Sequence, residues 1–175
     1  MKVRSPQLSL RLEAEAAEAA TRWRDGAELP FLGGRLVLRL ATEYAAAGCD
    51  GDCLHLPLPP GASPRQIQDA AEAWLRREAT RIIAATLKRL ALTHGNRALP
   101  RWTLSFAARG DWTQVRADAT LRFNWRLVEQ SPRHIEDALA LAFAALPRNL
   151  APAAPDLLTA LSPPPETALQ TYSPL

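Results

Sequence analysis

Histidine is the side chain from which a zinc site or a general base is most readily built, and this chain of 175 residues has three histidines. They are His55, His94 and His134, each far from the other two in sequence. A zinc hydrolase of the helical type needs two imidazoles one helical turn apart and a carboxylate beside the metal-bound water. None of the three histidines has a partner at that spacing, so no ready-made zinc motif is present.

The two cysteines are the next candidates for chemistry. Cys49 and Cys53 flank the turn-forming sequence Asp50-Gly51-Asp52. A C-x3-C pair could supply half of a metal site or form a strained disulfide, but no second cysteine pair exists to complete a site. Two free thiols beside a turn are therefore the favoured interpretation.

The most informative stretch runs from Thr120 to Leu150. Apolar and polar residues alternate over residues 121–127, which predicts a half-buried strand. Ser131 is a good N-cap and Pro132 suits the first position of a helix that we expect over residues 132–146. No polar side chain occurs between Ala138 and Leu146, so this helix is expected to be buried on most of its faces.

Several separated pieces of this chain resemble one known family, the YgjP-like zinc metallopeptidases, which are zincin-type relatives of the SprT-like proteins. The family pattern runs Leu-Ser, Trp-Gly-Ser-Cys, Asn-Trp-Arg-Leu, and then a helix that carries His-Glu-x-x-His. The matching pieces here extend over roughly residues 28–150. They are Leu29-Pro30-Phe31-Leu32-Gly33, residues 54–62, residues 73–77, Leu104-Ser105, Trp112, Asn124-Trp125-Arg126-Leu127 and Asp137.

The resemblance implies a zinc site on the 132–146 helix, but the ligands are missing. Ala142, Phe143 and Leu146 stand where the family has His, Glu and His. The third ligand belongs to an Asn-His-Ser-Pro stretch, whose best match here is residues 149–152, Asn-Leu-Ala-Pro. Thr113-Gln114-Val115 replaces Gly-Ser-Cys. We therefore predict a degenerate member without catalytic residues, metal ligands or cofactor, in which the motif residues Trp112, Asn124, Trp125 and Arg126 keep a structural role.

The expected fold is α+β of the SprT-like type. A small antiparallel sheet should pack against a long helix over residues 64–93 and against the buried helix over residues 132–146, and Trp112 and Trp125 should be core aromatics. The prolines after Leu56 predict that the strand over 53–58 lies at an edge of the sheet. The other expected strands are 29–32 and 35–40, which form a hairpin around Gly33-Gly34, and then 101–108, 111–116 and 121–127.

Composition shifts divide the chain into three segments. Residues 1–27 are predicted to hold an N-terminal helix, over about residues 9–23, and its lead-in. Residues 28–150 form the degenerate metallopeptidase-like domain, and residues 151–175 a proline-rich C-terminal tail. The N-terminal residues contain no apolar core of a signal peptide, and no apolar stretch is as long as a membrane helix, so we expect a cytoplasmic protein of bacterial type.

These observations favour a non-catalytic pseudo-metallopeptidase with a binding or structural role, whose partner would be a peptide or protein in the former cleft. One alternative is an active zinc-dependent peptidase or hydrolase with displaced ligands, which alone would need zinc. Another is a nucleic-acid-binding module that uses the basic helix 64–93, although a net charge of +3 attracts a polyanion only weakly. A fourth is a decaying gene product without a selected activity.

Overall fold

The computed structural model describes residues 22–95, 97–107 and 110–147. The helix expected over about residues 9–23 falls mostly outside them, and the tail expected over 151–175 falls wholly outside. The elements in chain order are β1 (Glu28–Phe31), β2 (Gly34–Leu40), β3 (Gly48–Asp50), β4 (Cys53–Leu56), α2 (Pro64–Thr93), β5 (Trp102–Ser105), β6 (Thr113–Val115), β7 (Leu121–Asn124), the 3₁₀ helix η1 (Trp125–Glu129) and α3 (Pro132–Ala144).

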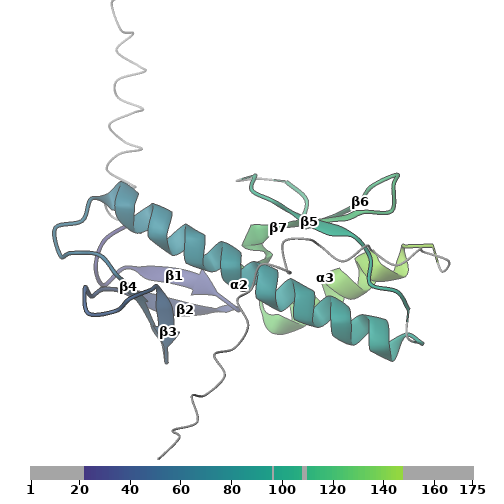
Figure 1. Cartoon of the computed structure of the whole chain (residues 1–175), viewed down its shortest axis with the longest axis horizontal. Helices are drawn as coiled ribbons and strands as arrows, with labels where there is room; N and C mark the ends of the chain where they lie inside the picture. Colours follow the sequence, from purple (N-terminus) through teal and green to yellow (C-terminus); the bar gives the residue numbers. More distant parts are fainter. Residues whose placement is uncertain (1–21, 96, 108–109, 148–175) are drawn as a thin grey trace, which may run out of the picture.

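The long helix α2 has the bounds that the sequence predicts, and it connects two hydrophobic cores. Ser63 caps its N-terminus in a capping box with Gln66, and Pro64 begins the helix. The first half of α2 buries Ile67, Trp74 and other side chains in one core, while its second half buries side chains from Ile83 onward in the other. Figure 1 shows the β1–β4 sheet beside the first half, and β5–β7 with α3 beside the second. In the described part of the chain, no helix is long and apolar enough to cross a membrane.

The first sheet has the strand order β1-β2-β4-β3, in which β2 and β4 run parallel and the other pairs are antiparallel. The prediction that the 53–58 strand lies at an edge is wrong, because β3 pairs with its outer side. The strand β3 was not predicted, because it has only three residues and includes a glycine. The strand β4 ends at Leu56, where Pro57 removes the next backbone donor.

The turn between β1 and β2 fastens the first sheet to the segment that leads into α3. It is formed by Leu32 and Gly33, both at positive φ, one residue earlier than expected. The Leu32 amide donates to the Val128 carbonyl at 2.8 Å, and the Gly33 amide donates to the Glu129 carbonyl at 3.3 Å. A side chain at residue 33 would have its Cβ 2.9 Å from the Cα of Ser131, so this approach requires glycine.

The second sheet has the order β5-β7-β6, with β5 parallel and β6 antiparallel to the central strand β7. The α+β class is therefore confirmed, but the single antiparallel sheet of the prediction is replaced by two mixed sheets. Leu121 and Phe123 of β7 are fully buried against the helices. The neighbouring Arg122 lies, by the alternation of a strand, on the other face of the sheet.

The strand expected over residues 121–127 ends early, at Asn124. The Asn124 side chain accepts a hydrogen bond from the Arg126 amide at 3.0 Å and so caps the 3₁₀ helix η1. An asparagine side chain that bonds to the backbone amide two residues further on competes with a strand ladder, which explains the early end. The alternation of apolar residues continues into η1, where Trp125, Leu127 and Val128 are all buried.

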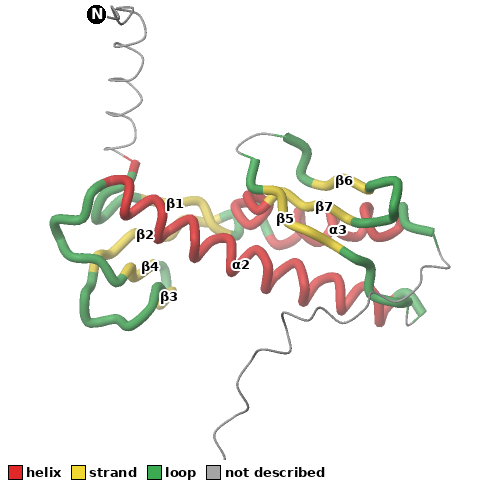
Figure 2. Tube along the Cα trace, turned by 45° about the horizontal axis from the view of Figure 1, so that its top comes forward, coloured by secondary structure: helices red, strands yellow, loops and turns green. Residues whose placement is uncertain are grey.

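Helix α3 runs from Pro132 to Ala144 and lies beside the second half of α2 (Figure 2). The Ser131 hydroxyl accepts from the His134 amide at 3.3 Å, as expected of an N-cap. The prediction that α3 is buried on most faces is wrong, because the Leu141 side chain is 74% exposed. One stripe faces the core, and the exposed positions outside it include Arg133, His134, Asp137 and Leu141. The buried stripe consists of Ile135, Leu139, Ala142 and Phe143, followed by Leu146 just after the helix.

The two motif tryptophans differ in burial, and only one of them is a core residue. Trp125 is 3% exposed, whereas Trp112 is 38% exposed, which corrects the prediction for Trp112. Thr113 pairs with Phe123 on the core side of the sheet, so the preceding Trp112 projects toward the other face. Because of this difference in burial, we expect Trp125 to contribute much more than Trp112 to the free energy of unfolding.

We predict that Trp125→Ala lowers the free energy of unfolding by about 3–5 kcal/mol, the usual cost of removing a large aromatic from a core. The matched control, Trp112→Ala, should cost about 1 kcal/mol or less, because its side chain is partly in water. Denaturant titration of both variants measures the difference. Equal losses of stability would contradict the different placement of the two rings.

Candidate functional site

The three positions expected to carry the zinc motif lie together at the C-terminal end of α3, and all face the core. The exposed fractions of Ala142, Phe143 and Leu146 are 4%, 1% and 4%. They pack in one hydrophobic cluster with Ile83, Leu87 and Leu90 of α2. None of the three side chains has a lone pair for a metal ion, and no metal could reach them without opening the core.

The ring of Phe143 is held by two polar residues that follow α2. The guanidinium of Arg97 lies 4.7 Å from the ring centroid, a cation–π distance, and His94 makes an edge contact at 5.9 Å. Arg97 also donates to the carbonyl oxygens of Leu146 at 3.1 Å and Pro147 at 2.9 Å. Arg97 thus satisfies carbonyls beyond the end of α3 with a charge that suits the helix dipole.

The role of Arg97 was not predicted, because this residue belongs to no motif and lies in a loop between α2 and β5. Its contacts with Phe143 and the end of α3 join residues that are 46 to 50 positions apart in the chain. Only the packing of α3 against α2 brings them together, so no local sequence pattern could have identified the role of Arg97.

The three histidines are distributed over separate elements. His55 lies in β4 and stacks on Tyr44 with ring centroids 4.5 Å apart. His94 caps the C-terminus of α2, with its Nδ1 2.9 Å from the Leu90 carbonyl oxygen. His134 is exposed in the first turn of α3. Within the described residues, no three His, Cys, Asp or Glu side chains come close enough together to hold a metal ion.

The two cysteines are free thiols on the β3–β4 hairpin. Cys49 pairs with Leu54 and Cys53 with Asp50, so the alternation of the strands places the two thiols on opposite faces. Burial, and then the negative charges of Asp50 and Asp52, raise the pKa of the Cys49 thiol. A raised pKa disfavours the thiolate that would be the nucleophile or metal ligand.

The other motif residues form a polar and aromatic cluster where η1 meets α2. The guanidinium groups of Arg76 and Arg126 lie 5.3 and 5.1 Å from the centroid of the Trp125 ring. Arg126 forms an ion pair with Glu129 at 3.2 Å, and Arg76 forms one with Glu72 at 2.6 Å. Of these contacts, the one between Arg76 and Trp125 joins α2 to η1, and the structural role of Trp125 and Arg126 stays a prediction.

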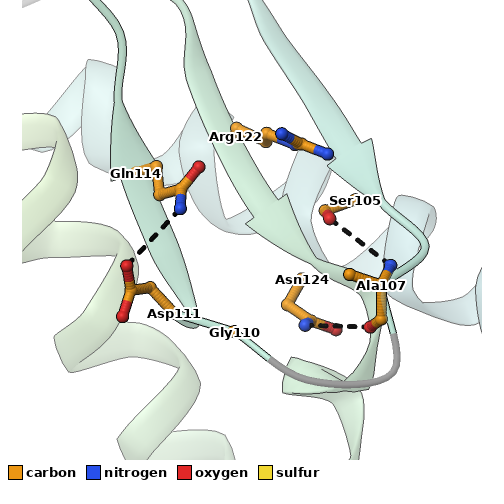
Figure 3. Close-up of a pocket in the computed structure, with 7 residues that line it drawn as sticks. All are labelled: Ser105, Ala107, Gly110, Asp111, Gln114, Arg122 and Asn124. Carbon is orange, nitrogen blue, oxygen red and sulfur yellow. Dashed lines mark hydrogen bonds between the residues drawn. The ribbon is translucent and has the colours of Figure 1, made fainter.

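One small pocket opens at the end of the second sheet, separate from the Ala142–Phe143–Leu146 positions (Figure 3). Its volume is about 110 Å³. The motif residue Asn124 lines it and donates from Nδ2 to the Ala107 carbonyl at 3.2 Å. The complete lining is Ser105, Ala107, Gly110, Asp111, Gln114, Arg122 and Asn124.

The basic side chains of α2 are largely neutralised by acidic neighbours. Four arginines of this helix form ion pairs, three of them with carboxylates three or four residues away and one with α3. A nucleic-acid surface needs cations that are free to meet phosphates. The pairs are Arg65–Asp69, Arg76–Glu72, Arg81–Glu78 and Arg89–Glu136.

Comparison with known protein families gives one assignment. A model of the YgjP-like metallopeptidase domain matches residues 7–137, and the chain therefore belongs to the YgjP-like family. The family supports a zincin-like scaffold for the architecture described above. The match ends at Asp137, immediately before the apolar run that begins at Ala138. No curated protein and no solved structure matches the chain.

Glu129, at the end of η1, and Glu136, in α3, have pKa values shifted in opposite directions. Burial raises the pKa of Glu129, with a further contribution from Glu72, against the attraction of Arg126 and Arg22. The hydrogen bond from Arg89 and its charge lower the pKa of Glu136. The ordinary value for both carboxyl groups is 4.5.

We predict opposite effects of pH when each glutamate is replaced by glutamine. A raised folded-state pKa means that Glu129 stabilises the fold below pH 4.5, and that this contribution is lost as the pH rises through the folded-state value. The lowered pKa of Glu136 means that its contribution is present above pH 4.5 and is lost as the pH falls. Unfolding of wild type, Glu129→Gln and Glu136→Gln from about pH 3 to about pH 7 tests both signs. Differences of the same sign in both variants would contradict the assigned environments.

Proposed function

We propose that this chain is a non-catalytic member of the YgjP-like family, a pseudo-metallopeptidase that serves a binding or structural role. One observation carries the proposal: Phe143, at the position expected for the general-base glutamate, is 1% exposed and packed within the core. A metallopeptidase needs water and a cation at that place. A buried phenylalanine ring excludes both.

The contacts of Phe143 support this proposal beyond simple burial. Arg97 lies over the Phe143 ring and also donates to the carbonyl oxygens of Leu146 and Pro147. The ring is therefore packed against the same residue that caps the C-terminal end of α3. Burial of such a side chain contributes roughly 1.5–3 kcal/mol to folding. The replacement is therefore integrated into the fold, which favours a maintained scaffold over a decaying gene product.

The alternative of a zinc enzyme with displaced ligands has less support in the described residues. The three histidines lie on separate elements, and the two cysteines point to opposite faces of their hairpin. The nucleic-acid alternative is weakened by the ion pairs along α2. The cytoplasmic location remains a prediction from the sequence.

We predict that the full chain, equilibrated with zinc and then desalted, holds far less than one zinc ion per molecule and hydrolyses no peptide. The reason is the absence of lone pairs at Ala142, Phe143 and Leu146. Metal analysis of the protein and a peptide-library digest provide the measurement. The double variant Cys49→Ser, Cys53→Ser controls for zinc held by thiols. One zinc per chain that persists in this variant, and whose removal abolishes hydrolysis, would contradict the proposal.

A further inference from the structure

The pocket in the second sheet lies on the face opposite the hydrophobic core. Arg122 pairs with Thr103 of β5 and with Gln114 of β6, and all three alternate with residues that face the helices. The volume of the pocket, about 110 Å³, is far above the roughly 10–15 Å³ that a single water needs. It is below the roughly 300–1,000 Å³ of pockets that hold drug-sized ligands. The space fits a small molecule.

The walls of the pocket offer hydrogen-bonding groups that are partly unused by the protein. The Ser105 oxygen accepts from the Ala107 amide at 3.5 Å, which leaves its own O–H free to donate. Asn124 is 3% exposed and is fixed at both ends of its amide, by the Ala107 carbonyl and by the Arg126 amide. Asn124 therefore forms a rigid part of the wall, whereas the Ser105 hydroxyl hydrogen can rotate toward a ligand.

Two oppositely charged residues, the half-buried Arg122 and the exposed Asp111, are among those that line this pocket. Arg122 supplies a guanidinium and Asp111 a carboxylate, and neither has an ion-pair partner in the described part of the chain. Gln114 donates to Asp111 at 3.4 Å, a long hydrogen bond that leaves most of the carboxylate's accepting capacity free. Figure 3 shows Asp111 and Gln114 on one side of the pocket and Ser105, Ala107 and Asn124 on the other, with Arg122 above them and its guanidinium on the Ser105 side.

We propose that this pocket binds a small zwitterion of the α-amino acid class. Arg122 would hold the ligand's carboxylate, with the Ser105 hydroxyl as a second donor, because a guanidinium matches a carboxylate in geometry and charge. Asp111 and the Gln114 carbonyl oxygen would accept from the ligand's ammonium group. A ligand with only one charge would leave the other protein charge without a partner. The site is separate from the Phe143 region and does not depend on the absence of catalysis.

The test is a titration of the full chain with L-alanine, followed by two-dimensional NMR, with acetate and ethylammonium as single-charge probes. We expect saturable shifts at the lining residues with L-alanine, and much weaker binding of either single-charge probe. Arg122→Gln and Asp111→Asn should each weaken binding by about tenfold or more, the effect of losing a hydrogen bond between charged groups. Arg116→Gln and Asp137→Asn, which change charges outside the lining, should leave the affinity unchanged.

Two results would overturn the proposal. One is the absence of any saturable shift at the lining residues while the spectrum shows a folded protein. The other is acetate binding as tightly as L-alanine, with Asp111→Asn having no effect, which would make the pocket a simple carboxylate site. Neither result would bear on the zinc content or the peptidase activity of the chain.

Discussion

The packing of the α3 stripe against the second half of α2 is the contact on which the C-terminal half of the molecule depends. Leu139 is fully buried, and Phe143 and Leu146 are nearly so, in the same cluster as Leu87 of α2 and Phe123 of β7. Each such side chain contributes roughly 1.5–3 kcal/mol when removed from water. This one cluster joins α2, α3 and the second sheet, so the space beside α3 is filled rather than available for a ligand.

An apolar cluster that excludes water and a hydrolytic metal site cannot both occupy the space beside the C-terminal end of α3. Zinc requires polar ligands that are themselves oriented by hydrogen bonds, and the metal-bound water requires an open position. A carboxylate placed among Leu87, Leu139 and Leu146 would stay protonated or lose much of its hydration energy. In this member of the family, the positions expected for the metal site thus lie in an apolar interior.

The sequence predicted those parts of the fold that depend on local chemistry. The N-cap residues Ser63 and Ser131, each followed by a proline, define the starts of α2 and α3. The motif around Asn124-Trp125-Arg126 placed the central strand and supported the family, although the strand ends at Asn124 because its side chain bonds to the backbone. Periodicity alone could not separate a strand from a 3₁₀ helix whose residues are also buried.

The remaining features depend on contacts between distant segments. The exposure of Trp112 follows from the register of β6 against β7, and the role of Arg97 follows from where α3 ends beside α2. The pocket needs Arg122, Asp111 and Ser105 from three different segments of one sheet region. None of these relations has a spacing signal in the chain, so no sequence pattern could predict them.

The most direct measurement of the central claim is the stability of the variant Ala142→His, Phe143→Glu, Leu146→His, with and without zinc. If the positions expected for the metal site are core, this variant should lose several kcal/mol without metal, about the cost of a core cavity together with a buried polar group. Zinc should restore at most part of that loss, because residue 150 is a leucine and supplies no third ligand. A variant as stable as wild type without zinc would contradict the account, because the space around residue 143 would then have to be open to water.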